Sequence, residues 1–248
     1  MGYDLHITRA PFWIAGAYYP IWERELADLI EREPDLWSEP DRKGARPAFL
    51  DGRPDRIAGL PVRDSLRMFG WDDGAGTVDR GEAEWLQVSG GQIQRKWPGE
   101  ALTRRMAELA RDFDAWLMGD DGELYVPDAG GTIVGRDRVP EEYPPGFGVH
   151  PDHVLVREES PIGREEWLRV AAGLPDFSVD REVEVLLPSG WRAIRCPEVA
   201  RWTGHPSGRP VPFFHHADGY LDVHRADHAT VARMRELAPA LAAEAREL

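Results

Sequence analysis

Two segments, RRMAELARDFDAWL at residues 104–117 and ARMRELAPALAAEA at residues 232–245, carry almost the same pattern. Their cores, residues 105–110 and 233–238, differ at one position, and their apolar residues recur at helical spacing. We therefore predict a helix at each place. When this register is extended towards the N-terminus, EWLQVSGGQIQRKW aligns without a gap to PFFHHADGYLDVHR, with Trp85 on Phe213. Both read as an aromatic-rich strand, a tight turn with glycine and a second strand.

A second pair of segments lies upstream of the first. PIWERELADLIEREPDLW at residues 20–37 aligns with PIGREEWLRVAAGLPDFS at residues 161–178, again without a gap. Each segment predicts an amphipathic helix that ends before a proline. A candidate strand precedes each helix, at residues 4–9 and 152–157. Three matches in the same order indicate a tandem duplication.

The expected fold is α+β, with two copies of a small module that contains a strand, a helix, antiparallel hairpins and a final helix. Residues 1–127 form the first module with extended loops, residues 128–147 a linker rich in glycine and proline, and residues 148–248 the second module. We expect a pseudo-two-fold arrangement of the copies. A cleft between them would be a natural place for a small ligand.

Composition excludes several classes of function. The net charge of −14 disfavours binding to nucleic acid, and no basic patch offsets it. No apolar run is long enough to span a membrane, and the N-terminus lacks the features of a signal peptide. A single cysteine, Cys196, rules out an internal disulfide framework and a cysteine-rich zinc site. We expect a cytoplasmic protein without a cofactor, and the scarcity of lysine relative to arginine suggests a GC-rich bacterial genome.

The opening MGYDLHITR, followed by a helix that ends in a Pro-Asp pair, resembles the start of a group of small bacterial proteins of unassigned function. MGDDGELY at residues 118–125 resembles their tail, and WTGHP at residues 202–206 resembles an internal Trp-Thr segment of the group. Such proteins are similar to immunity-type and interaction proteins. The resemblance implies binding rather than catalysis, and it supplies no catalytic residue.

An acidic stretch in the first module predicts where a partner binds. Its residues precede the aromatic hairpin, and they are Asp72, Asp73, Asp79, Glu82 and Glu84, followed at once by Trp85. Acidic side chains beside aromatics suit a basic protein, through electrostatic steering and a desolvated aromatic centre. We therefore favour a non-enzymatic binding protein of the immunity or antitoxin kind.

Histidines of the second module support an alternative. The predicted hairpin can bring His216 and His224 onto adjacent strands with Asp222 nearby, and His205 lies just upstream. Two imidazoles and a carboxylate can bind zinc or iron and leave positions open for catalysis. The alternatives are thus a metal-dependent enzyme or binder at these residues, and a small-ligand binder in the cleft between the modules. Cys196 precedes a proline and follows an apolar strand, which favours a buried thiol over a nucleophile.

Overall fold

The computed structural model describes residues 3–33, 35–38, 68–71, 84–137, 146–224 and 226–247. Contacts within the chain divide it into two compact units. The first comprises Met1–Arg138 together with Val185–Arg192, and the second comprises Val139–Glu184 and Ala193–Leu248. The predicted linker is partly built into these units, because one strand at residues 133–136 pairs within the first and another begins at residue 146.

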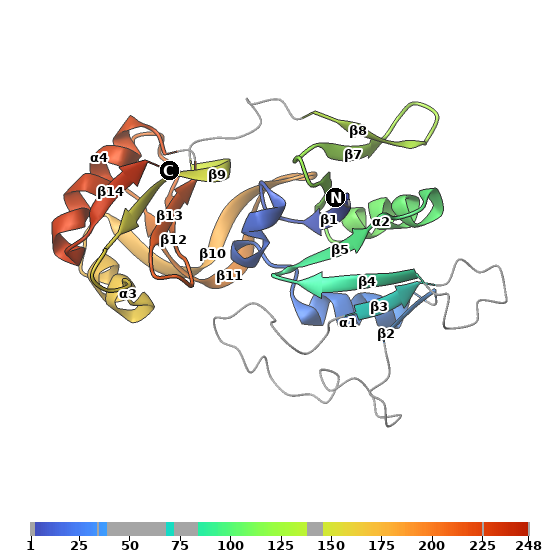
Figure 1. Cartoon of the computed structure of the whole chain (residues 1–248), viewed down its shortest axis with the longest axis horizontal. Coiled ribbons are helices and arrows are strands. Elements are labelled where there is room, and N and C mark those ends of the chain that lie inside the picture. Colours follow the sequence, from blue (N-terminus) through green and yellow to red (C-terminus); the bar gives the residue numbers. More distant parts are fainter. Residues whose placement is uncertain are drawn as a thin grey trace, which may run out of the picture. The chain divides into compact units, whose positions relative to one another are not determined.

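The first unit contains an eight-stranded antiparallel sheet with the order β2-β3-β4-β5-β1-β6-β7-β8 (Figure 1). Its strands are β1 (Asp4–Thr8), β2 (Leu36–Ser38), β3 (Met68–Trp71), β4 (Glu84–Ser89), β5 (Gln92–Lys96), β6 (Trp116–Gly119), β7 (Leu124–Pro127) and β8 (Ile133–Arg136). Its helices are the 3-10 helix η1 (Trp13–Tyr18), α1 (Glu23–Arg32) and α2 (Glu100–Asp112).

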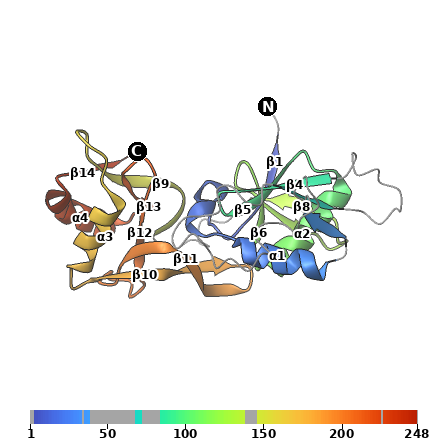
Figure 2. The same ribbon diagram turned by 90° about the horizontal axis from the view of Figure 1, so that it is seen from below.

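The second unit contains a six-stranded sheet with the order β10-β11-β12-β13-β9-β14. Its strands are β9 (Gly146–Val156), β10 (Phe177–Leu187), β11 (Gly190–Trp202), β12 (Val211–His215), β13 (Leu221–His224) and β14 (Glu244–Glu247). The end of β10 and the start of β11, within residues 185–192, belong to the first unit. Its helices are α3 (Arg164–Ala172), α4 (His228–Leu237) and the 3-10 helix η4 (Ala238–Leu241). Figure 2 shows both sheets from a second direction.

The two units have the same strand order over six strands. In the first, β1 lies between β5 and β6, and in the second, β9 lies between β13 and β14. The pairing register is also the same: Ile7 lies opposite Ile93 and Leu117, as Leu155 lies opposite Leu221 and Ala245. The α+β class is therefore as expected. A repeated order and register are what a tandem duplication predicts, and common descent of the two halves stays a prediction.

An arginine at the end of the first strand is anchored in the same way in each unit. Arg9 forms a bidentate pair with Glu25 at 2.8 and 2.9 Å and donates to the carbonyl of Phe113. Arg157 pairs in the same way with Glu166 at 2.8 and 3.1 Å and donates to the carbonyl of Leu241. Both glutamates also accept a backbone N–H at the start of their own helix, at Trp22 and Gly163. One carboxylate thus satisfies a helix N-terminus and fixes the helix to the first strand.

The final helix of each copy is shorter than its amphipathic pattern predicted. α2 ends at Asp112 and α4 at Leu237. The residues expected to continue α2 form a turn and the start of β6, and those expected to continue α4 form η4, a turn and the start of β14. Asp114 and Ala242 have left-handed backbone conformations, with φ of 48° and 47°, which end the helical path. The apolar residues of the interior strand β6 and the alanines just before β14 continue the helical pattern, so the sequence did not separate helix from strand.

The ungapped alignment of the aromatic hairpins was wrong by one residue. The turn between β4 and β5 has two residues, Gly90 and Gly91, whereas the turn between β12 and β13 has three, residues 217–219. As a result Leu86, and not Trp85, occupies the place of Phe213, and both side chains are fully buried in their cores.

Candidate functional site

Most of the predicted binding residues lie outside the described part of the chain. Asp72, Asp73, Asp79 and Glu82 belong to this group, whereas Glu84 and Trp85 begin strand β4. Trp71 and Glu84 are directly paired across β3 and β4. Both ends of the acidic connection are therefore fixed at one end of the first sheet.

Other residues of interest lie at this same end of the sheet. β4 and β5 are antiparallel, so Glu84 at the start of β4 lies beside the end of β5. β5 ends at Lys96, which is paired with Asp4 of β1. We call this end, from Glu84 across Lys96 and Trp97 to Asp4, the Trp97 end of the sheet.

Trp97 has an unusual conformation for a large aromatic residue. Its side chain is 65% exposed, and its φ of 53° lies in the left-handed region. It also precedes Pro98, although the residue before a proline normally adopts an extended backbone. Its N–H donates to the carbonyl of Tyr3 at 3.0 Å, which holds the bend against β1. The bend therefore presents an indole to solvent at a conformational cost of about 1–3 kcal/mol.

A second feature of the first unit is a buried histidine on the sheet face opposite α1 and α2. Leu5 and Ile7 point into the core beneath those helices, so His6 between them points to the other face. Its Nε2 lies 3.0 Å from Oδ1 of Asp120, whose Oδ2 accepts the backbone N–H of Asp4. The ring of Trp13, from η1, stacks on the imidazole with 4.5 Å between ring centroids.

This pair is closed rather than open to a substrate. The side chain of His6 is 2% exposed, and its Nδ1 is buried with no hydrogen-bond partner among the residues that the structure describes. Burial lowers the pKa of His6, although the Asp120 carboxylate acts in the opposite direction. An aspartate that orients a neutral histidine is the arrangement of a general base. Here Trp13 covers the ring and donates its indole N–H to the carbonyl of Asp120, so we assign the pair to holding η1 on the sheet.

The histidines proposed as metal ligands in the second unit are not brought together. His216 follows β12 at the turn, whereas His224 ends β13 at the far end of the same hairpin. Asp222 lies opposite Phe214 between them. Among the residues that the structure describes, no group of three or more His, Cys, Asp or Glu side chains is arranged to hold a metal ion. The sequence predicted correctly that His216, Asp222 and His224 belong to one hairpin, but it did not predict that the two histidines lie at opposite ends of it.

His205 lies apart from that hairpin, in the loop after β11. Its Nδ1 accepts the backbone N–H of Ser207 at 3.2 Å and lies 2.7 Å from that residue's hydroxyl. Its Nε2 therefore carries the proton and donates to Asp227 at 3.0 Å. Burial alone would raise the pKa of Asp227, but hydrogen bonds from Thr230 and His205 outweigh it and lower the pKa.

A hydrolytic triad also consists of a serine, a histidine and an aspartate, but the arrangement of Ser207, His205 and Asp227 is different. Ser207 is tied to the imidazole through its own backbone, and its hydroxyl accepts the N–H of Arg209. Asp227 caps the N-terminus of α4 by accepting the N–H of Thr230 at 2.9 Å. The three residues close a turn and attach it to α4.

Cys196 is not equipped for nucleophilic chemistry. Its side chain is buried, and burial raises the pKa of the thiol to about 12. A thiol with such a pKa is almost fully protonated at neutral pH. The structure agrees here with the buried thiol that the sequence predicted.

No protein-family model matches the chain, and neither a curated protein nor a solved structure is significantly similar to it. Within the described ranges, no helix is long and apolar enough to cross a membrane.

Proposed function

We propose that the chain is a non-enzymatic binding protein that uses the Trp97 end of its first sheet to engage a basic protein, in the manner of an immunity protein or antitoxin. The exposed, left-handed Trp97 carries this proposal. A large indole that is kept in solvent at a conformational cost is poorly explained by folding, and strained residues of this kind concentrate at functional sites. Tryptophan is also among the residues that most often dominate the free energy of protein–protein binding.

The charge around Trp97 supports a basic partner. The acidic connection that contains Asp72, Asp73 and Asp79 begins and ends at this end of the sheet. The whole chain carries a net charge of −14, which would steer a cationic protein towards it at low ionic strength. Of the interpretations drawn from the sequence, this one has the most support. A small-ligand site stays a prediction.

The test uses candidate partners encoded beside the gene for this chain. Each neighbouring product is expressed alone and with the wild-type chain, and protection of the host or a stoichiometric complex on gel filtration identifies the partner. Trp97→Ala is expected to weaken the complex at least about tenfold, the loss of one binding hot spot. Reversing Asp72, Asp73 and Asp79 to lysine is expected to abolish it.

Matched controls separate the surface from general effects. Val134→Ala removes another exposed apolar side chain, on β8, and should leave affinity unchanged. Reversing the exposed residues Glu165, Glu182 and Glu236 of the second unit to lysine changes the net charge by the same amount away from the first sheet. Unchanged affinity in both Trp97→Ala and the triple lysine variant of the acidic connection would overturn the proposal.

A further inference from the structure

The turn after the last helix has the same construction in both units. In the first unit it consists of Phe113, the left-handed Asp114 and Ala115, and it leads into β6. In the second it consists of Leu241, the left-handed Ala242 and Ala243, and it leads into β14. The N–H of Ala115 donates to Ala110 at 2.7 Å, and that of Ala243 donates to Ala238 at 2.9 Å. The surfaces beside the two turns can therefore be compared position by position.

In the first unit this surface binds the tip of a β-hairpin. The tip belongs to residues 185–192, which join β10 to β11 and are part of the first unit. The backbone N–H of Ser189 donates to Asp114 at 3.0 Å, and the Ser189 hydroxyl donates to the same carboxylate. The indole of Trp116 donates to the carbonyl of Leu186 at 3.1 Å. One carboxylate and one indole thus hold a hairpin turn.

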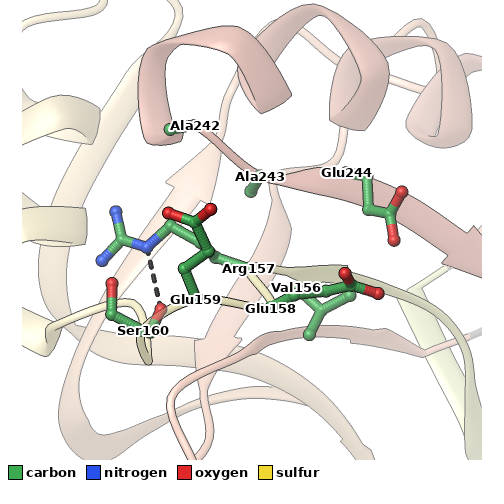
Figure 3. A pocket seen from close by; sticks show the side chains of 8 residues that line it. All are labelled: Val156, Arg157, Glu158, Glu159, Ser160, Ala242, Ala243 and Glu244. Atoms are coloured by element: carbon green, nitrogen blue, oxygen red, sulfur yellow. Dashed lines mark hydrogen bonds between the residues drawn. The ribbon is translucent and has the colours of Figure 1, made fainter.

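In the second unit the equivalent surface is an open depression with a volume of about 560 Å³. Figure 3 shows Ala242, Ala243 and Glu244 on one side of it and residues 156–160 on the other. Ala242 stands in the place of Asp114, and Glu244, the first residue of β14, stands in the place of Trp116, the first residue of β6. The backbone of the turn and of the strand after it is therefore the same in both units, but the two side chains that hold the hairpin tip in the first unit are replaced in the second.

The charge of the lining determines what kind of hairpin suits it. Among the described residues that line the depression, Glu158, Glu159 and Glu244 are acidic and Arg157 alone is basic. Arg157 is already paired with Glu166, and Arg246 pairs with Glu158 and Glu244. Glu159 is exposed at the rim. An occupant would therefore gain most by donating hydrogen bonds from a positively charged turn.

We propose that this depression binds the tip of a β-hairpin of a partner protein that carries arginine or lysine at its turn. The first unit shows that the turn and the strand after it can hold a hairpin tip, and the exposed carboxylate of Glu159 favours a basic one. The depression lies in the second unit and the Trp97 end in the first, so variants at one surface leave the other intact. The two proposals can therefore fail separately.

The experiment uses the full chain and cyclised hairpin peptides. The basic probe has residues 184–193 of this chain with Ser189→Arg, and the reference peptide keeps Ser189. Fluorescence anisotropy of the labelled peptides is expected to show binding of the basic probe at least about tenfold tighter than that of the reference, the gain of one charge-assisted contact. No binding of the basic probe, or equal binding of a linear peptide with the same composition in scrambled order, overturns the proposal.

Variants then locate the bound peptide. Glu159→Lys and Ser160→Trp, which reverse a rim charge and fill the space, are each expected to weaken binding of the basic probe at least about tenfold. Glu165→Lys, an exposed substitution with the same charge change on α3, should have no effect. If only Asp114→Ala weakens binding, the peptide has replaced the chain's own tip in the first unit and the proposal is wrong. It is also wrong if binding persists in both Glu159→Lys and Ser160→Trp while circular dichroism shows them folded.

Discussion

Trp97 exposes most of its indole in a backbone conformation that favours glycine and asparagine. If the exposed indole of Trp97 serves binding, tryptophan should favour binding at this position but lower the stability of the fold. The two properties can then be separated by one substitution, which makes stability a useful second measurement.

Trp97→Asn is expected to raise the free energy of unfolding by about 1 kcal/mol, because asparagine tolerates the left-handed region and little buried area is lost. Urea unfolding followed by far-UV circular dichroism measures this change. Ile14→Asn is the control, since Ile14 is 58% exposed and its φ is not positive. A loss of stability in Trp97→Asn comparable to that of a core substitution would show that the indole packs against the fold.

His6 predicts a dependence of stability on pH. Its pKa is lowered in the folded state, so the unfolded chain binds its proton more readily. The stability contributed by neutral His6 is therefore complete above the ordinary pKa of about 6.5 and declines as the pH falls below it. The slope cannot exceed about 1.4 kcal/mol per pH unit, the limit for one proton.

Thermal or urea unfolding between pH 7.5 and pH 5 tests this expectation as a difference between variants. His6→Gln should be less sensitive to acid over this range than the wild type, whereas His228→Gln, at an exposed position of α4, should match the wild type. Identical pH profiles for wild type and His6→Gln would contradict the assignment of a buried neutral imidazole.

At the scale of elements, a glycine in the β12–β13 turn joins the hairpin to the segment before α3. The carbonyl of Gly219 accepts the N–H of Ile162 at 2.7 Å, and Gly91 and Ile21 form the same contact in the first unit at 2.8 Å. A Cβ at Gly219 would lie 2.2 Å from the Cβ and 2.9 Å from the Cα of Pro161. The hairpin and helix can approach this closely only because the turn has no side chain.

Gly219→Ala is therefore expected to destabilise the fold by about 3 kcal/mol or more, through a positive φ of 81° and a clash with backbone. Gly208→Ala provides a matched control, because Gly208 has a φ of 74° but open space around its Cβ position. The control should lose only about 1–2 kcal/mol. Urea midpoints for both variants measure the difference, and equal losses would mean that packing against Pro161 contributes nothing.

At the scale of the whole molecule, the sequence predicted the α+β class because hydrophobic periodicity is set by local geometry. It did not predict β6, whose apolar residues continue the pattern of α2, or β14, a short and mostly exposed strand of sequence EARE. The pair of His6 and Asp120 was missed for the same reason, since Asp120 reaches His6 only through the pairing of β1 with β6. The alternation in DLHIT does indicate that His6 points away from Leu5 and Ile7. Trp97 can be read as exposed only once the ends of β4 and β5 are known.

The hairpin tip at residues 185–192 has a consequence for how the protein is made. Because these residues belong to the first unit, that unit is discontinuous in the chain. During synthesis Asp114 and Trp116 can form their hydrogen bonds to Ser189 and Leu186 only after residues 139–184 of the second unit have been made. The first unit therefore cannot be completed until part of the second has emerged from the ribosome. A gene fragment that ends near residue 138 would encode the first unit without one of its own pieces.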